Sequence, residues 1–385
     1  MYQVGFGDCF LVSFPGPHHM LIDCGVHPGG DNGKLESAVQ NIAEVTGGKL
    51  DLLIATHAHR DHLSGFAAYE KVFSTFEVAE VWLPWTENPK DPDAVRIKGA
   101  QQAMTATLVS HFSASPLPAD QQKAVDSVLE IASGNERALQ LLKTGFKGAT
   151  VTYLDAGRTF DAVSKIPGLS ASILGPPRDQ KLLGRMDPPT DQRFLRADGN
   201  TVIVSNAIRP FDKSWVVDGG ATPQYAAIGE REKNLIAVAS TASQAFPFAL
   251  DDNLNNTSIV ALFSYGGQHL LFPGDAQFGN WKNWIDKPES KDLLAKVTFF
   301  KVAHHGSLNA TPRSAVSGMT PKAFSAMTST STKPFKSIPL SRLMDALGDR
   351  ASSSVRSDAV PETLADGFQK GPFWLDCLLP VLESA

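Results

Sequence analysis

Three histidines and an aspartate fall within six residues of this sequence. The segment THAHRDHLSG, residues 56–65, holds His57, His59, Asp61 and His62. Imidazole and carboxylate groups are ligands that zinc prefers in proteins, and iron and manganese also accept them. Because the 385 residues contain ten histidines in all, such a density is not typical of a solvated polar loop. The segment therefore predicts a metal site.

The spacing divides these ligands between two ions. Alternate side chains of an extended segment point the same way, so we expect His57 and His59 to bind one metal. Asp61 and His62 come after the chain turns, and we expect them to face a second metal. Four ligands on one tetrahedral ion would leave no open position for a water or a substrate. We thus predict two divalent cations, Zn²⁺ first, with Mn²⁺ or iron as alternatives.

Two later segments offer further ligands at the ends of predicted strands. The sequence LLFPGD places Asp275 beyond a buried strand, where its carboxylate can bridge two metals, and VAHHGS places His304 and His305 after the next strand. Each segment alone is weak evidence, because a Gly-Asp pair after a strand is more often a turn. Together with the first segment they complete a set of ligands for a dinuclear site.

The hydrophobic pattern predicts an α/β fold that carries these ligands at strand ends. Strands are expected at 4–14, 20–24, 50–56, 78–83, 150–154, 169–174, 258–265, 269–272, 297–303 and 323–328, and helices at 34–46, 66–76 and 340–347. The main domain is expected to span 1–350, with a helical insertion at about 86–148 and a mixed insertion at about 178–250. Residues 351–385 are expected to form a tail that packs on the domain, with a loop over 351–366.

Composition excludes several classes of protein. The net charge of −5 is not that of a nucleic-acid binder that relies on overall basic charge. Three scattered cysteines do not form a disulfide framework. The sequence shows no signal peptide and no apolar run of about 18 residues, so we expect a cytoplasmic protein without a membrane span.

The order of the motifs resembles the metallo-β-lactamase superfamily, and within it the soluble-type domain of the ComEC-like DNA-uptake proteins and their stand-alone relatives. The matching motifs run in the same order over residues 1 to about 330, outside the two insertions. They are Val4–Asp8 (VGFGD), Leu21–Gly25 (LIDCG), His57–Gly65, Gly175–Pro177 (GPP), Asn255–Ser258 (NNTS), Gly274-Asp275 and Lys301–Ser307 (KVAHHGS).

This resemblance implies an αββα sandwich with the metals at one edge of the sheets. It assigns His57 and His59 to the first metal and makes Asp275 the bridge. His305 would complete the second site beside Asp61 and His62, because the final ligand of the family is typically followed by glycine.

The resemblance also suggests roles around the metals. His304 would face the substrate and stabilise a phosphate oxygen, and Asp61 would also take a proton from the attacking water. Asp23 would hold the HxHxDH loop from outside the ligand shell, although a turn residue after a strand is the alternative. Where many family members have another histidine ligand, this chain has Asn255 and Asn256, and Asn256 is expected near the first metal.

These features predict a dinuclear hydrolase, first of all a phosphodiesterase or nuclease that acts through a metal-bridged hydroxide, with a nucleic acid among its candidate substrates. Two alternatives stay open because fold does not determine function. One is a hydrolase of a small ester, lactone, thioester or phosphorylated metabolite, and the other is a binding protein without catalysis. No protein partner is predicted.

Two further groups of residues have a functional and a structural interpretation. Basic residues of the second insertion would form a rim for an anionic substrate or simply a solvated face: Lys181, Arg185, Arg193 and Arg196. Tryptophans would line a substrate pocket or pack in the core: Trp82, Trp85, Trp281 and Trp284.

Overall fold

Two β-sheets face each other in the computed structural model, which describes residues 1–29, 34–100, 102, 135–194, 254–333 and 335–381. The first sheet has, in spatial order, β1 (Cys9–Phe14), β2 (His18–Cys24), β3 (Lys49–Ile54), β4 (Glu77–Pro84) and β5 (Thr150–Leu154). β1 and β2 are antiparallel, and the other neighbours are parallel. The parallel strands therefore end at the same edge of this sheet.

The second sheet runs in the order β12 (Ser353–Arg356), β11 (Ser325–Thr328), β10 (Phe299–Lys301), β9 (Gln268–Phe272), β8 (Val260–Tyr265), β7 (Ser170–Gly175) and β6 (Thr159–Phe160). Strands β9 to β12 are parallel, whereas β6 to β9 are antiparallel neighbours. A separate hairpin consists of β13 (Phe368–Lys370) and β14 (Leu375–Cys377).

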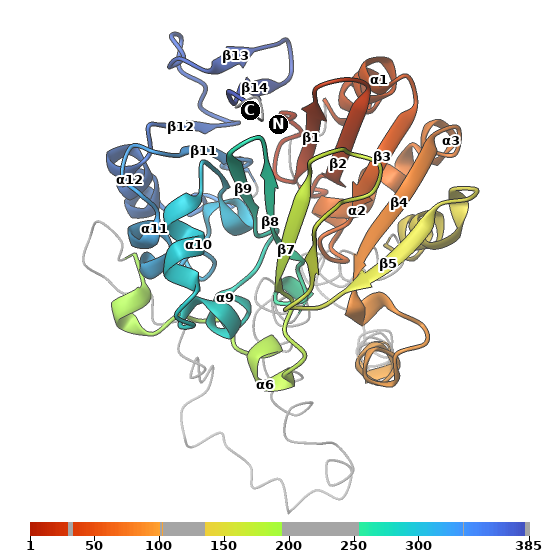
Figure 1. Cartoon of the computed structure of the whole chain (residues 1–385), viewed down its shortest axis with the longest axis horizontal. Coiled ribbons are helices and arrows are strands. Elements are labelled where there is room, and N and C mark those ends of the chain that lie inside the picture. Colours follow the sequence, from red (N-terminus) through yellow and green to blue (C-terminus); the bar gives the residue numbers. More distant parts are fainter. Residues whose placement is uncertain (30–33, 101, 103–134, 195–253, 334, 382–385) are drawn as a thin grey trace, which may run out of the picture.

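Helices cover the outer face of each sheet (Figure 1). On the first sheet lie α1 (Leu35–Thr46), α2 (Arg60–Ala68) and α3 (Glu70–Phe73). On the second lie α9 (Phe278–Ile285), α10 (Ser290–Lys296), α11 (Arg313–Gly318) and α12 (Ser341–Arg350). The short α6 (Gln180–Leu183) packs against α9.

The three largest buried hydrophobic clusters correspond to the three interfaces between these layers. Along β8, Ala261 and Phe263 point between the sheets, while Val260 and Leu262 point to the helices. Trp82 of β4 lies in the layer between the sheets, against Phe263. This alternation, expected for strands that are buried on both faces, confirms the predicted αββα sandwich.

The four tryptophans that were candidates for a substrate pocket belong to the core. Trp82, Trp85, Trp281 and Trp284 are at most 3% exposed. The indole of Trp85 donates to the carbonyl of Pro177, and that of Trp281 donates to the carbonyl of Ala276. The structure therefore supports core packing, and not a substrate pocket, as the role of these tryptophans.

Several predicted boundaries were wrong; the strand expected from Val4, for example, begins at Cys9. The helix expected at 66–76 begins at Arg60, so Asp61 and His62 lie in its first turn rather than in a loop. The expected loop at 351–366 contains β12, which joins the second sheet beside β11. Its sequence, SSVR, buries a single apolar side chain, Val355. Pairing with a neighbouring strand, and not hydrophobic alternation, therefore makes this segment a strand.

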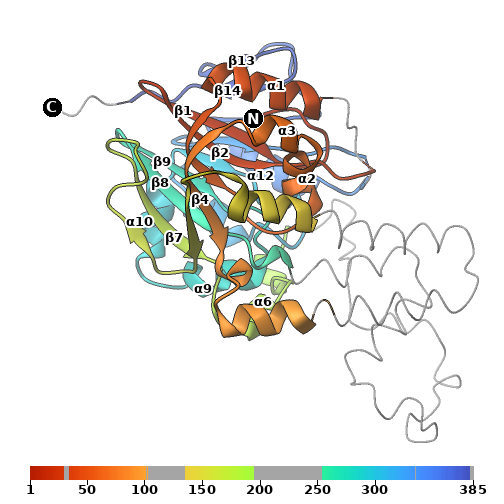
Figure 2. The same ribbon diagram turned by 90° about the vertical axis from the view of Figure 1, so that its right-hand side faces the viewer.

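The tail packs on the amino-terminal segment (Figures 1 and 2). Tyr2 forms an isolated β-bridge with Trp374, and the backbone amide of Leu375 donates to the carbonyl of Met1 at 2.9 Å. In the first insertion, residues 92–100 and 135–140 are helical, whereas 101 and 103–134 lie outside the described residues. Residues 195–253, most of the second insertion, lie outside the described part. Among the described helices, none combines the length and the apolar character that a membrane span requires.

Candidate metal centre

The predicted ligands come from both sheets and meet at one edge of the sandwich. The loop after β3 and the first turn of α2 carry the HxHxDH residues. The loop after β9 carries Asp275, and the turn after β10 carries His305. Each of these six side chains belongs to a residue that is at most 9% exposed. Because buried polar groups need partners, such a collection indicates a ligand-binding centre.

Four of the ligands surround a common space. One donor atom from each lies within 4.8 Å of the others, and the group consists of Asp61, His62, Asp275 and His305. Nε2 of His305 is 3.1 Å from Oδ2 of Asp61 and 3.3 Å from Oδ2 of Asp275. Nε2 of His62 is 3.1 Å from the same oxygen of Asp275. The residues predicted for the second metal and for the bridge are thus together.

The predicted first site has fewer protein ligands. The rings of His57 and His59 have centroids 4.5 Å apart, and His57 also packs against His62 at 4.2 Å. Within the described ranges, no third His, Cys, Asp or Glu forms with this pair a compact group like that around Asp275.

Hydrogen bonds define which nitrogen of each imidazole faces the centre. Nδ1 of His62 lies 2.7 Å from Oδ2 of Asp23, and Nδ1 of His305 lies 2.9 Å from the carbonyl oxygen of Ser329. Both oxygens are acceptors, so both Nδ1 atoms carry the proton and donate it. In the neutral rings, Nε2 then presents its lone pair to the common space, as a metal ligand must.

His57 is oriented through Thr56. The hydroxyl of Thr56 donates to Oδ2 of Asp23 at 2.7 Å, so toward Nδ1 of His57, 3.1 Å away, it can only accept. Nδ1 of His57 therefore donates, and Nε2 keeps the lone pair. This Nε2 is buried without a hydrogen-bond partner. Asp23 thus controls two imidazoles, directly for His62 and through Thr56 for His57.

A β-bulge places Asp23. Cys9 pairs with Cys24, but the next residue of β1, Phe10, pairs with Ile22, so Asp23 is the extra residue on β2. Its φ of 56° lies in the left-handed region, which aspartate tolerates better than most residues. The predicted role of Asp23 in holding the HxHxDH loop agrees with its contacts to Thr56 and His62.

The electrostatics of the centre favour a positive charge. Burial opposes protonation of His305, but the carboxylates of Asp275 and Asp8 outweigh it and raise its pKa to about 10. Burial likewise opposes protonation of His62, yet Asp275 and Asp23 raise its pKa well above the usual value. The pKa of His57 is instead lowered, first by burial and then by the neighbouring imidazoles.

The residues present fit divalent metal ions. Oδ2 of Asp275 and Nε2 of His62 are buried and face each other at 3.1 Å without a hydrogen bond. A positive charge between these atoms stabilises them, and because the Nδ1 protons are directed outward, the unprotonated imidazoles would offer Nε2 to a metal cation there. Mixed imidazole and carboxylate ligands suit zinc, manganese or iron.

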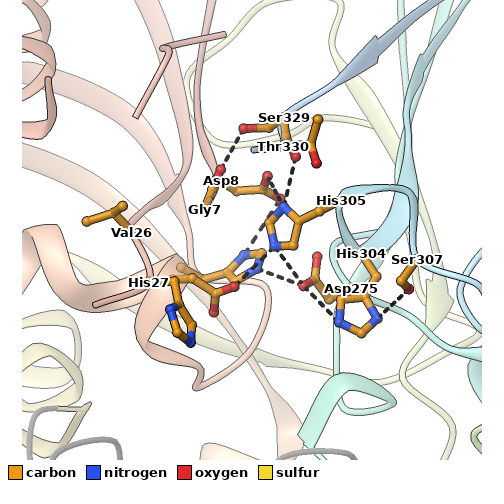
Figure 3. Close-up of polar contacts among 12 residues, drawn as sticks. Gly7, Asp8, Val26, His27, Asp275, His304, His305, Ser307, Ser329 and Thr330 are labelled. Carbon is orange, nitrogen blue, oxygen red and sulfur yellow. Dashed lines mark hydrogen bonds and ion pairs between the residues drawn. The ribbon is translucent and has the colours of Figure 1, made fainter. Parts of the chain in front are cut away.

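His304 lies at the more open side of the centre (Figure 3). Its side chain is 19% exposed, and its Nε2 is 3.9 Å from Oδ2 of Asp275. Nδ1 faces the hydroxyl of Ser307, which itself donates to Asn309, so Nδ1 is again the protonated nitrogen. Burial lowers the pKa of His304 to about 4, so the ring is neutral near pH 7.

The backbone is strained at the His-His pair. His304 and His305 have φ values of 46° and 55°, both in the left-handed region that disfavours such side chains. Strain of this kind persists where the surrounding structure imposes it, and it is frequent at functional sites. The turn directs the two neighbouring imidazoles to different sides of Asp275 (Figure 3).

Asn256 joins segments of the fold. Its Nδ2 donates to the carbonyls of Leu183 and Arg185 at 3.0 and 2.9 Å. Its Oδ1 accepts from the amides of Gln277 and Asn280, each at 3.1 Å. Both ends of the amide thus tie the loop after α6 to α9, and a contact with the first metal stays a prediction.

Three of the four basic residues predicted to form a rim for an anionic substrate lie in the described part of the chain. Lys181 and Arg185 are exposed, and the guanidinium of Arg185 lies over the ring of Phe278 at 4.9 Å. Arg193 donates to the carbonyl of Pro188. Arg196 lies outside the described residues.

Sequence reasoning missed three buried residues that contact the candidate site or its loop. Asp8 and Lys301 form a buried ion pair next to Asp275, and Asn135 donates to the carbonyl of Ala58 between the first two histidines. Asp8 and Lys301 stood inside quoted motifs, which was a signal that could have identified them. Asn135 stood in an insertion without a recognisable motif.

Comparisons with known proteins gave one family match and several similar solved structures. Residues 2–151 match the family model of the metallo-beta-lactamase superfamily. A solved structure from Parabacteroides distasonis, classed provisionally as a metal-dependent hydrolase, is 13% identical, with 90% of this chain and 88% of that chain covered and a TM-score of 0.33. Zn²⁺-bound PqqB from Methylobacterium extorquens is 8% identical, with coverages of 93% and 88% and a TM-score of 0.38. No curated protein matches.

The superfamily match spans β1 to β4 and the HxHxDH segment. Together with the sandwich architecture it confirms the predicted metallo-β-lactamase fold, and it agrees with the prediction of a metal-dependent hydrolase.

Proposed function

We propose that this protein is a phosphodiesterase or nuclease that depends on two divalent cations, with Zn²⁺ the first candidate. Its protein ligands are His57, His59, Asp61, His62, Asp275 and His305. The observation that carries this proposal is the convergence of Nε2 of His62 and Nε2 of His305 on one oxygen of Asp275, at 3.1 and 3.3 Å, with each Nδ1 held outward by an acceptor.

The chain supplies groups that can move protons beside the metals. Two divalent cations bound there would lower the pKa of a water and polarise the scissile bond. Asp61, with a side chain 12% exposed, is placed to take a proton from the attacking water. Nε2 of His304 keeps a lone pair, because its Nδ1 proton is directed to Ser307. It is therefore an alternative acceptor for that same proton, which it would then return to the leaving oxygen.

This assignment of His304 differs from the predicted one. The sequence predicted a residue that stabilises a phosphate oxygen, which requires an N–H directed at the substrate. The hydrogen bond to Ser307 instead leaves Nε2 with a lone pair, so proton transfer is the better supported role.

Two features support a phosphodiester as the substrate class. The order of motifs resembles the ComEC-like branch, including VGFGD before β1 and KVAHHGS at the end of β10. A centre built around cations attracts an anion such as a phosphodiester.

The test is to purify the protein, count its metals by mass spectrometry and assay bis-p-nitrophenyl phosphate, single- and double-stranded DNA, and RNA. His57→Ala and Asp275→Asn are assayed in parallel. His269→Ala is the matched control, since His269 lies at the opposite end of β9 from Asp275 and bonds to Ser264. We expect metal-dependent cleavage that is lost in both ligand variants and retained in the control.

Other outcomes would replace this proposal. Metal binding without cleavage of any phosphodiester would favour a small ester, lactone or thioester as substrate. Protein that binds no metal after dialysis against Zn²⁺ or Mn²⁺ would favour a binding protein without catalysis.

A further inference from the structure

A buried lysine lies among the carboxylates of the metal centre. Lys301, the last residue of β10, is 2% exposed. Its Nζ forms an ion pair with Oδ2 of Asp8, lies 3.2 Å from Oδ1 of Asp275 and donates to the carbonyl of Gly274 at 2.9 Å. A fully buried lysine is rare and stable only when its charge is paired.

The two oxygens of Asp275 face different partners, Lys301 on one side and the histidines on the other. Oδ1 faces the ammonium of Lys301 at 3.2 Å, whereas Oδ2 faces Nε2 of His62 and Nε2 of His305 at 3.1 and 3.3 Å. Because Lys301 holds Oδ1, a metal that binds on the histidine side meets a single carboxylate oxygen. If two ions bind there, Asp275 could serve both of them only through Oδ2.

A second cluster of potential metal ligands adjoins the first, and Lys301 pairs with one of its carboxylates. Donor atoms of Asp8, Asp23 and His62 lie close enough together to hold a cation. Oδ2 of Asp8, however, is already paired with Lys301. The ammonium of Lys301 thus has two anionic neighbours, the carboxylates of Asp8 and Asp275.

We propose that Lys301 is a fixed internal cation of the metal centre, a positioning residue that presents Oδ2 of Asp275 to the metals. Asp8 anchors it, and the amide of Asp8 also donates to the carbonyl of Asp61 at 3.0 Å, so one residue ties the lysine to the HxHxDH loop. Formally, the four carboxylates of Asp8, Asp23, Asp61 and Asp275 would balance two divalent cations, and Lys301 adds one positive charge that favours an anionic substrate.

This inference rests on the proposed metal centre, and metal binding rather than turnover tests it. The variants are Asp8→Asn, Lys301→Met and the double variant Asp8→Asn/Lys301→Met. Metal-stripped proteins are titrated with Co²⁺, which reports ligand geometry through its visible absorption, and their melting temperatures are measured without metal.

Lys301→Met removes the ammonium from beside two buried carboxylates, so we expect its melting temperature to fall by roughly 5–10 °C. The double variant removes one of these charges and should recover most of that loss. In the double variant Oδ1 of Asp275 still lacks its contact with the ammonium of Lys301. We therefore expect an altered Co²⁺ spectrum and roughly 10–100-fold weaker Co²⁺ binding, as for other groups that orient a metal ligand. Asp8→Asn removes the charge that anchors the lysine but leaves the lysine beside Asp275, so we expect a lower melting temperature with the Co²⁺ spectrum and affinity of the unmodified protein.

The outcomes separate a positioning role from a merely structural one. If the double variant binds Co²⁺ with the spectrum and affinity of the unmodified protein, Lys301 only stabilises the fold and the inference is wrong. If Lys301→Met does not fold, the comparison of Asp8→Asn with the double variant decides the matter. Unmodified protein that binds no Co²⁺ would overturn the proposed function as well.

Discussion

Oδ2 of Asp23 accepts a hydrogen bond from Nδ1 of His62 at 2.7 Å and a second one from the hydroxyl of Thr56 at 2.7 Å. One carboxylate oxygen thereby determines the proton position on two histidines of different predicted metals. Asp23 is the bulged residue of β2 and has a left-handed backbone conformation. This conformation directs its carboxylate toward Thr56 and His62.

Asp23→Asn should lower metal affinity by roughly 10–100-fold. An amide can direct an N–H at Nδ1 of His62, which would move the ring proton to Nε2 and block the ligand atom. Zinc binding by competition with a chelator measures the effect. The control is Asp51→Asn, because Asp51 also contacts a histidine, His18, but away from the centre. Equal affinity in both variants would contradict the assigned role of Asp23.

The two metals should bind with different strengths. The group around Asp275 offers four protein ligands within 4.8 Å, whereas His57 and His59 form no such group with a third described residue. We expect one ion to remain after dialysis and the second to need added metal. Titration calorimetry with Zn²⁺ on stripped protein measures this, and two equally tight sites would show that the first site has a further ligand.

Gly25→Ala should displace the backbone of the HxHxDH loop, which carries the predicted metal ligands. A Cβ at Gly25 would lie 2.5 Å from both the carbonyl carbon of Asp61 and the amide nitrogen of His62, which is closer than real Cβ atoms approach. The backbone of the ligands must therefore shift. We expect a loss of metal-dependent activity of about tenfold or more, since small displacements of catalytic groups are costly. Gly348→Ala in α12, with open space at its Cβ, should be silent.

Asn135→Ala should show that the first insertion stabilises the HxHxDH loop. Nδ2 of Asn135 donates to the carbonyl of Ala58 at 2.5 Å, and the residue is 6% exposed. Loss of this bond leaves a buried carbonyl unsatisfied, which costs about 1–3 kcal/mol. We expect lower stability in urea and weaker binding at the His57 and His59 site. Gln140→Ala, on the same helical segment but exposed, is the control.

Asn256→Ala tests whether this residue is structural or a substitute ligand. It should destabilise the protein by at least about 2 kcal/mol, because it leaves buried backbone groups of the α6 loop and α9 without partners. The Co²⁺ spectrum of the folded variant should not change. A changed spectrum together with unchanged stability would instead place Asn256 at the first metal.

The metal loop and the sandwich could be predicted because their signals are local. His57, His59, Asp61 and His62 are close together in the chain, and a short continuous apolar run predicts a buried strand such as β8 without knowledge of its neighbours. Asp275 and His305 could be added because each follows a buried strand, and parallel strands of one sheet end at the same edge.

The tertiary structure decided what holds those ligands. Asp8 and Lys301 are 293 positions apart in the numbering, and no periodicity links them, so their ion pair exists only because β1 and β10 come from facing sheets. The same applies to Asn135 and Ala58. The proton positions on the imidazoles likewise depend on acceptors from distant segments, Asp23 and Ser329. The sequence by itself determined which residues can bind metal; the packing of two sheets determined their orientation and charge, because burial makes each partner obligatory.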